Sequence, residues 1–233
     1  MAGILYIVST PIGNYEDITL RALRILREVD LVVCEEFKEG KKLLYHYEIQ
    51  TELESLNEHN EARVTPYLLD QLIQGKRIAL ISDAGTPVFS DPGLSLVQRA
   101  LEANIPVHPV PGPSSLMAAL VVCGFDLSKF LYYGWLSPKK EIRRRELSAL
   151  KKEKKPIVLL DTPYRLIPVL EDITLIFGPD QEIAVALDLT LPSEEIRRGP
   201  VGKVRDYYKE KKTSGEFVLI INSPQPLRKS TRR

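Results

Sequence analysis

The residues best suited to chemistry lie in a loop of small and acidic residues that follows an apolar segment. Residues 79–81 are predicted to end a buried strand, and residues 82–87, SDAGTP, follow directly. Residues 90–93, SDPG, then lead into a predicted helix. Small residues let a ligand approach the main chain, and ligands of open α/β sheets bind beyond the carboxyl ends of the strands. This loop is therefore a candidate ligand site, although its composition also fits an ordinary turn between a strand and a helix.

Other carboxylates follow other predicted strands. Glu35 and Glu36 come directly after the predicted strand of residues 30–34, DLVVC, and Asp161 comes after the predicted strand of residues 156–160. A carboxylate in such a position can hold the hydroxyls of a ribose or act as a general base. A solvated loop edge explains the pair Glu35 and Glu36 equally well.

Two further turns are rich in small residues and proline. Residues 10–14, TPIGN, follow the first predicted strand, and residues 111–115, PGPSS, precede an alanine-rich helix over residues 116–122. Ser114 is a good N-cap, and the free N–H groups at a helix start can bind an anion or a carboxylate. A rigid turn followed by a cap explains the second segment as well. Because the first turn lacks the GxGxxG spacing, its spacing alone is weak evidence for a nucleotide site.

Strands that alternate with helices position these loops in the first half of the chain. Strands are predicted over residues 4–8, 30–34, 77–81 and 107–110, with weak alternation over residues 52–56. Helices are predicted from residue 18 onward and over residues 41–47, 62–74 and 93–103. Thr19 or Asp17 is predicted to cap the first of these helices, and Asn60 the third. The alternation predicts a parallel sheet with helices on both faces.

The alternation pauses at residues 124–126, which predicts a domain of residues 1–125 and a second α/β domain of residues 126–223. Within the second domain, residues 139–155 carry nine Lys or Arg against three Glu. This stretch is predicted to be a helix with a solvated face, and its clustered cations also suit an RNA backbone. Residues 224–233 are basic and are expected to form a disordered tail.

The composition limits the class of protein. With 233 residues, 44% hydrophobic and 27% charged, the chain is predicted to be soluble and globular. Its net charge of +1 excludes a general attraction to polyanions, so a nucleic-acid contact needs a local basic patch. Cys34 and Cys123 are predicted to be reduced core residues, and three histidines without a CxxC motif indicate no metal site. The absence of a long apolar segment and of a signal-peptide pattern predicts a cytoplasmic protein without a membrane span.

Taken together, the turns resemble one family. TPIGN after the first strand, SDAGTPVFSDPG in the middle and PGPSS before a helix occur in the order and spacing of that family, and EHNE and a terminal GEFVLII strand add to the match. The chain resembles the bacterial 16S ribosomal RNA ribose 2′-O-methyltransferases that act on a cytidine, within the tetrapyrrole (corrin/porphyrin) methylase superfamily. The resemblance covers residues 4–222.

The resemblance implies two α/β domains, with a mostly parallel N-terminal sheet and a mixed C-terminal sheet, S-adenosylmethionine between them, and a homodimer. It implies cofactor contacts at Pro11, Gly13, Ser82, Asp83, Ala84, Gly85, Thr86, Pro87, Ser114, Ser115, Thr162 and Pro163. The carboxylates to consider as base or orienting group are Glu35, Glu36, Asp83 and Asp161. Contacts with 16S ribosomal RNA or the small ribosomal subunit are expected from Lys38, Glu58, Arg143, Arg144 and Arg145.

Three segments depart from the pattern of that family. The usual EDTR-x-T-x-KLL is EEFKEGKKLL here, the usual ESPHR is DTPYR, and the usual ARELTK is ALDLTL. In the first of these segments Lys38 replaces an arginine, and Arg and Lys are not equivalent in binding phosphate, so the positioning of RNA is expected to differ. The resemblance is therefore stronger on the cofactor side than on the substrate side. Two alternatives therefore stay open: a methyltransferase acting on a tetrapyrrole or another small molecule, and a cofactor- or RNA-binding homologue that has lost catalysis.

Overall fold

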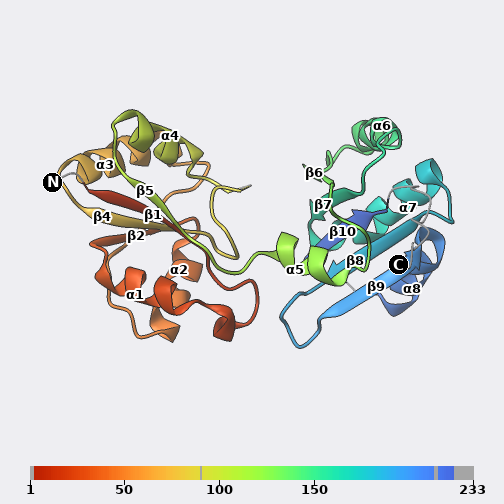
Figure 1. Ribbon diagram of the computed structural model, residues 1–233, viewed down its shortest axis with the longest axis horizontal. Helices are drawn as coiled ribbons and strands as arrows, with labels where there is room; N and C mark the ends of the chain where they lie inside the picture. The colour runs from red at the N-terminus through yellow and green to blue at the C-terminus, as the bar shows by residue number, and fades with distance from the viewer. Residues whose placement is uncertain (1–2, 90, 213–214, 223–233) are drawn as a thin grey trace, which may run out of the picture. The chain divides into compact units, whose positions relative to one another are not determined.

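The computed structural model describes residues 3–89, 91–212 and 215–222, which form two compact α/β units (Figure 1). Contacts divide the chain into Met1–Ser114 and Ser115–Arg233. This division comes earlier than the predicted boundary at residue 125, because helix α5, Ser115–Val122, packs on a strand of the second unit. The predicted tail of residues 224–233 lies outside the described residues. Among the helices of the described residues, none has the length and apolar character to span a lipid bilayer.

The first unit is built on a sheet of five parallel strands. They are β1 (Ile4–Val8), β2 (Leu31–Cys34), β3 (Leu53–Ser55), β4 (Arg77–Ile81) and β5 (Val107–Val110). Their order is β3-β2-β4-β1-β5, which confirms the predicted parallel sheet. The register pairs Val8 with both Ile81 and Val110. The loops that follow β1, β4 and β5 therefore leave the same edge of the sheet side by side.

Helices cover both faces of this sheet, as predicted (Figure 1). On one face lie α1 (Leu20–Glu28) and α2 (Phe37–His46), and on the other α3 (Glu61–Ile73) and α4 (Leu94–Glu102). A short 3-10 helix, η1 (Tyr15–Asp17), precedes α1. Thr19 caps α1, because its side chain accepts a hydrogen bond from the N–H of Ala22 at 3.1 Å.

Asn60 occupies the N-cap position of α3 but does not cap it with its side chain, contrary to the prediction. Its Oδ1 accepts from the N–H of Asn57 at 2.8 Å, and its Nδ2 donates to the carbonyl of Ser55 at 3.0 Å. The side chain therefore fixes the turn between β3 and α3. A local turn can compete with a helix start for the same amide, since both offer it hydrogen bonds.

The second unit contains a mixed sheet, as expected. Its strands are β6 (Leu131–Gly134), β7 (Ile157–Asp161), β8 (Glu182–Leu187), β9 (Glu195–Pro200) and β10 (Phe217–Ile221), in the order β6-β7-β10-β8-β9. Only β6 and β7 pair in parallel, and the other neighbours are antiparallel. The core lies between one face of the sheet and the helices α6 (Lys140–Leu150), α7 (Leu166–Phe177) and α8 (Val201–Lys211).

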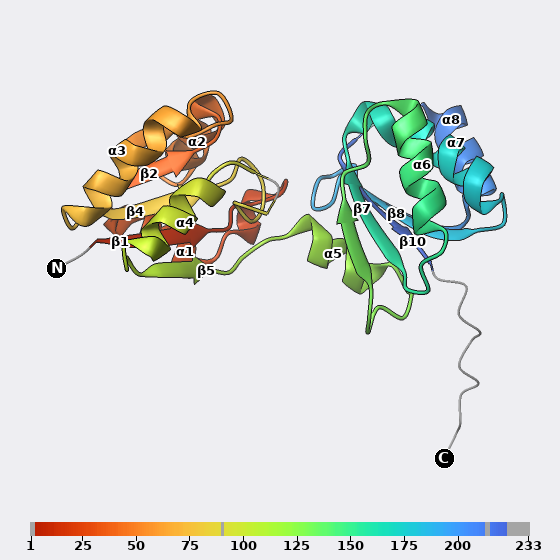
Figure 2. The ribbon, with the colours of Figure 1, turned by 90° about the horizontal axis from the view of Figure 1, so that it is seen from above.

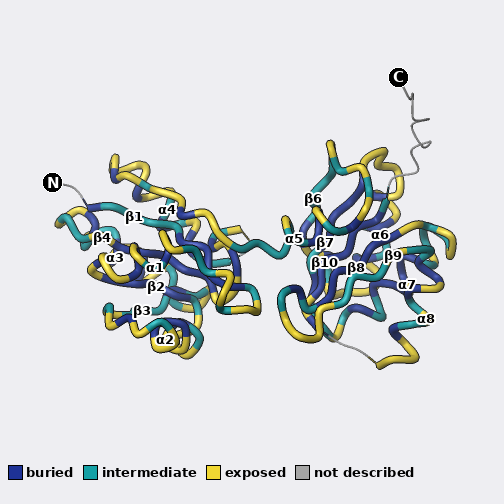
Figure 3. Tube along the Cα trace, turned by 60° about the horizontal axis from the view of Figure 1, so that its bottom comes forward, coloured by how far each residue is buried: buried dark blue, intermediate teal, exposed yellow. Residues whose placement is uncertain are grey.

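Helix α5 lies on the opposite face of the second sheet from α6, α7 and α8 (Figure 2). The strands are buried through the middle of each unit, while the outer sides of the helices are exposed (Figure 3). Cys34 and Cys123 are both buried and free, as predicted.

Candidate functional site

Hydrogen bonds join three of the predicted loops at the carboxyl edge of the first sheet. The main chains of Thr10 and Gly85 bond to each other, N to O at 2.8 Å and 3.2 Å, and the hydroxyl of Thr10 donates to the carbonyl of Ser82 at 2.9 Å. The hydroxyl of Thr86 lies 3.0 Å from that of Ser9 and donates to the carbonyl of Pro113 at 3.3 Å. The loops after β1, β4 and β5 thus form one surface, as their shared edge predicts.

The close approach of these loops requires glycine at two positions. Gly85 has φ of +86°, and a Cβ there would lie 3.2 Å from Cγ2 of Ile12. A Cβ at Gly112 would lie 3.0 Å from Cβ of Ser9. Positive φ is strained for residues with a side chain, so Gly85 fixes the bend of its loop. Of the cofactor residues predicted in this unit, Asp83, Ala84, Thr86 and Gly13 are exposed, whereas Pro11, Ser82, Gly85 and Pro87 are buried.

Carboxylates gather beside this surface. The N–H of Glu36 donates to Oδ1 of Asp83 at 3.1 Å, and burial, followed by the charges of Asp91, Asp83, Glu36 and Glu58, raises the pKa of Glu35. Burial also raises the pKa of Asp83; the N–H of Glu36 opposes that rise, while nearby carboxylates add to it. The structure therefore brings together Glu35, Glu36 and Asp83, with Glu58 close enough to affect Glu35. Lys38, in the first turn of α2, is exposed.

Asp91 belongs to this acidic group, although sequence reasoning did not single it out as a site residue. Its Oδ2 accepts a hydrogen bond from the hydroxyl of Ser82 at 2.6 Å, which ties the second Ser-Asp segment back to the first. The repetition of Ser-Asp at residues 82–83 and 90–91 was the signal in the sequence. Despite this acidic group, no set of three or more His, Cys, Asp or Glu in the described part of the chain is arranged to hold a metal ion.

Asp161 and Thr162 lie at the end of β7 in the second unit, whereas Glu35, Glu36 and Asp83 belong to the first unit. Asp161 is 2% exposed, and its Oδ1 accepts from the N–H of Thr162 at 2.8 Å and lies 3.3 Å from Nε of Arg165. Burial raises the pKa of Asp161, while the N–H of Thr162 and the charges of Arg165 and Arg143 oppose that rise. Within the described residues, Oδ2 of Asp161 and the hydroxyl of Thr162 have no hydrogen-bond partner. Pro163 begins the 3-10 helix η2 (Pro163–Arg165) directly after them.

The three arginines of the basic stretch have different environments. Arg143 is buried and lies 2.7 Å from Oδ2 of Asp172, whose Oδ1 lies 2.6 Å from Nε of Arg144. Arg145 is exposed. A buried guanidinium that pairs with a buried carboxylate cannot at the same time neutralise a phosphate, so the RNA contact predicted for Arg143 does not fit this structure. The helix also ends at Leu150, before the predicted residue 155.

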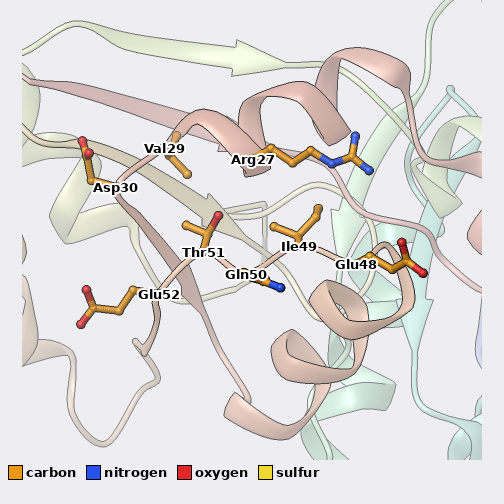
Figure 4. Close-up of a pocket in the computed structure, with 8 residues that line it drawn as sticks. All are labelled: Arg27, Val29, Asp30, Glu48, Ile49, Gln50, Thr51 and Glu52. Atoms are coloured by element: carbon orange, nitrogen blue, oxygen red, sulfur yellow. The ribbon is translucent and has the colours of Figure 1, made fainter.

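A shallow pocket lies away from this surface (Figure 4). Its residues precede β2 and β3, so it lies at the amino ends of these parallel strands, opposite the edge from which the loops leave. Both acidic and basic side chains line it, which gives it no single charge preference. The lining residues are Arg27, Val29, Asp30, Glu48, Ile49, Gln50, Thr51 and Glu52.

Comparison with known families and sequences gives a consistent result. Residues 4–205 match the family model described as tetrapyrrole (corrin/porphyrin) methylases. The chain is 44% identical over 223 residues to a ribosomal RNA small subunit methyltransferase I of Thermotoga maritima, covering 96% of this chain and 100% of that one. A protein of the same name from Escherichia coli O157:H7 is 41% identical over 221 residues, covering 94% of this chain and 77% of that one.

Solved structures agree on the fold. A uroporphyrin-III-C-methyltransferase from Thermus thermophilus matches with a TM-score of 0.65 and 23% identity, covering 94% of each chain. A diphthine synthase matches with a TM-score of 0.72 and 14% identity, covering 95% of this chain and 90% of that one. At these identities the likeness shows the fold alone, and it confirms the predicted fold class.

Proposed function

The chain belongs to the tetrapyrrole (corrin/porphyrin) methylase family, and we propose that it transfers a methyl group from S-adenosylmethionine to a ribose 2′-hydroxyl of a cytidine in 16S ribosomal RNA. The main support is 44% identity over the whole length of a relative named a ribosomal RNA small subunit methyltransferase. The choice of the 2′-hydroxyl and of cytidine rests on the resemblance of the loop motifs.

The residues of the first unit fit S-adenosylmethionine. The cofactor carries two cationic groups, the sulfonium and the ammonium, together with one carboxylate and two ribose hydroxyls. In the acidic group of Glu35, Glu36, Asp83 and Asp91, burial and then the neighbouring carboxylates raise the pKa of Glu35. A bound cation would relieve the repulsion between these carboxylates. We propose that the exposed Asp83, Ala84 and Thr86, with Gly13, line the cofactor site.

The resemblance implies further cofactor contacts in each of the two units. In the second unit, the hydroxyl of Thr162 lies beside Asp161 and is a polar group of a kind that a ligand can contact. Buried residues of the loops would shape the site through their main chains. We include in the proposed site of the first unit Pro11, Ser82, Gly85, Pro87 and Ser114. Contacts from Ser115, Thr162 and Pro163, which belong to the second unit, are proposed from the resemblance alone.

The cofactor, when bound, supplies a methyl group on a positively charged sulfur atom. The protein must therefore align the acceptor oxygen and accept its proton. Glu35 and Asp83 are the favoured bases, because burial and neighbouring carboxylates raise their pKa values and so make each a stronger proton acceptor. Asp161 is a weaker candidate, since it is buried against Arg165.

We propose that the RNA contacts Lys38, Glu58 and Arg145, which are all exposed. Arg144, which is partly exposed, can approach a phosphate only while it also pairs with Asp172. The partner would be the small ribosomal subunit or its 16S RNA, and the site of action would then be the cytoplasm. A homodimer is proposed from the resemblance alone.

Transfer of a labelled methyl group from S-adenosylmethionine to small ribosomal subunits tests this proposal. We expect incorporation into 16S RNA at a cytidine ribose, mapped by resistance of the neighbouring phosphodiester bond to alkali. Labelling of a porphyrinoid but not of the subunits would instead favour a small-molecule acceptor. Cofactor binding measured by calorimetry without transfer to either acceptor would favour the homologue that has lost catalysis.

A further inference from the structure

Helix α2 exposes two rows of side chains on the side away from the buried core of its unit. Residues four positions apart lie on the same face of a helix. All six residues of these rows are exposed, and much of α2 is marked as exposed in Figure 3. The rows are Phe37, Lys41 and Tyr45, and Lys38, Lys42 and His46.

The packing of the opposite side fixes this orientation. Leu43 and Leu44 are buried in the core between α2 and the sheet. Gly40 faces Cys34, because a Cβ at Gly40 would lie 2.6 Å from Sγ of that cysteine. The helix therefore cannot rotate about its axis, and the two rows must face outward.

The outward face combines aromatic rings with cations. Tyr45 is 85% exposed and Phe37 is 49% exposed, far more than a large aromatic side chain retains when it packs in a core. His46 stacks on Tyr15 with ring centroids 4.1 Å apart, which adds a further ring beside the second row. Phe37 and Tyr45 stand about two turns apart in one row with Lys41 between them, so aromatic and cationic side chains alternate along it.

The charges of this face suit a polyanion. Lys42 lies 3.7 Å from Glu39, whereas Lys38 and Lys41 form no ion pair within the described residues. Helix α2 carries three lysines against one carboxylate, Glu39, and the two exposed rows contain no carboxylate. A partner attracted by these lysines must carry closely spaced negative charges.

The position of α2 connects this face with the carboxylates of the proposed site. The helix begins directly after Glu36, whose N–H bonds to Asp83. With a rise of about 1.5 Å per residue, Lys38 and Tyr45 lie about 10 Å apart along the helix axis. A single RNA strand that reaches the carboxylates of Glu36 and Asp83 can therefore contact about two turns of α2.

We propose that this α2 face, defined by the six residues above, binds a single-stranded segment of the RNA substrate, an inference that rests on the proposed function. The lysines contact phosphates, and a base stacks on Tyr45. Sites for single-stranded nucleic acid combine cations with aromatic rings in this way. Paired RNA keeps its bases stacked inside the helix, so a ring on the protein surface favours an unpaired segment.

The test measures binding of a fluorescein-labelled single-stranded RNA, and of a duplex, by the full chain. The triple variant K38Q/K41Q/K42Q is compared with R63Q/K76Q/R99Q, which removes the same charge from elsewhere in the first unit. We expect the α2 variant to bind the single strand at least about ten-fold more weakly. The slope of log affinity against log salt concentration should become about two units less steep, since each phosphate contact to a single strand contributes roughly 0.7 to that slope. The control variant should lose much less affinity for the single strand, and the α2 variant should lose much less affinity for the duplex.

A second pair of variants tests stacking. Tyr45→Ala should weaken single-strand binding about ten-fold, whereas Tyr45→Phe, which keeps the ring, should bind like the unaltered protein. Circular dichroism checks that both variants fold. Equal RNA affinities of the two triple variants would overturn the proposal. So would a Tyr45→Ala variant that keeps its RNA affinity but changes the sedimentation coefficient of the protein, because that result would show that Tyr45 lies in a contact between protein chains.

Methyl transfer to small ribosomal subunits separates this inference from the proposed function. Transfer by the unaltered protein reports on the function, and the affinity of the α2 variants reports on the surface. We expect these variants to raise KM more than they lower kcat. If the unaltered protein transfers no methyl group, the proposed function fails. If it transfers normally and the α2 variants match it in KM and RNA affinity, only the α2 inference fails.

Discussion

The main-chain N–H of Glu36 donates to Oδ1 of Asp83 at 3.1 Å and thereby joins the loops that follow β2 and β4. These two strands are neighbours in the sheet, with Val33 paired to Leu80. The carboxylate of Asp83 is therefore held by the backbone of the adjacent loop. A side chain fixed in this way can present its other oxygen in one direction, which suits a group that orients a ligand or accepts a proton.

Replacing Asp83 by Asn tests its charge with little change in shape. The amide oxygen can still accept from the N–H of Glu36, so we expect the fold to persist. The loss of a base would lower methyl transfer about 10²- to 10⁴-fold. Single-turnover transfer to small ribosomal subunits measures the effect, and circular dichroism provides the folding control. Full activity in this variant would exclude Asp83 as a base or orienting group.

The raised pKa of Glu35 predicts how the stability of the protein depends on pH. Burial and nearby carboxylates disfavour its charged form in the folded state, so its pKa is higher there than in the unfolded chain. Its contribution to stability is therefore fully present below the ordinary pKa of a glutamate and is lost as the pH rises through the folded pKa. Glu35→Gln should raise the melting temperature at neutral pH but not in acid. An equal change at both pH values would contradict this origin.

The meeting of the loops could be predicted because it follows from the parallel sheet. The segments TPIGN, SDAGTP and PGPSS were predicted to be turns, because each is rich in small residues and proline and follows a predicted strand. The carboxyl ends of parallel strands share one edge of the sheet, so these turns were expected to lie side by side. The hydrogen bonds that join them could not be predicted, since they depend on the register that pairs Val8 with Ile81 and Val110. The register of β2 on β4, which pairs Val33 with Leu80, brings Asp83 to Glu36.

The environments of the arginines in α6 were missed, although the sequence contained a signal. Leu147 and Leu150 are buried, and Arg143 lies one turn before Leu147 on the same side of the helix. The run of three arginines nevertheless reads as a uniform basic patch. What the sequence could not supply was the partner, because Asp172 comes from α7, far along the chain.

The buried pair predicts unequal effects of neighbouring arginine substitutions. Arg143→Ala leaves the buried carboxylate of Asp172 with Arg144 as its remaining partner, and we expect a loss of about 3 kcal/mol in the free energy of unfolding. Arg145→Ala, at an exposed position, should change it by less than about 0.5 kcal/mol. Urea denaturation compares the two variants. Similar losses in both would show that the pairing of Arg143 does not stabilise the unit.

Gly85 offers a test of whether the joined loops form the cofactor site. Its φ of +86° means that Gly85→Ala strains the backbone by about 1–2 kcal/mol, and the new Cβ presses on Ile12 across the Thr10–Gly85 bridge. Gly178, which follows α7, also has a positive φ, of +99°, but a Cβ there meets no atom within 4 Å. Both alanine variants should lose stability, whereas only Gly85→Ala should weaken S-adenosylmethionine binding measured by calorimetry. Unchanged cofactor affinity in Gly85→Ala, with the expected loss of stability, would place the cofactor away from these loops.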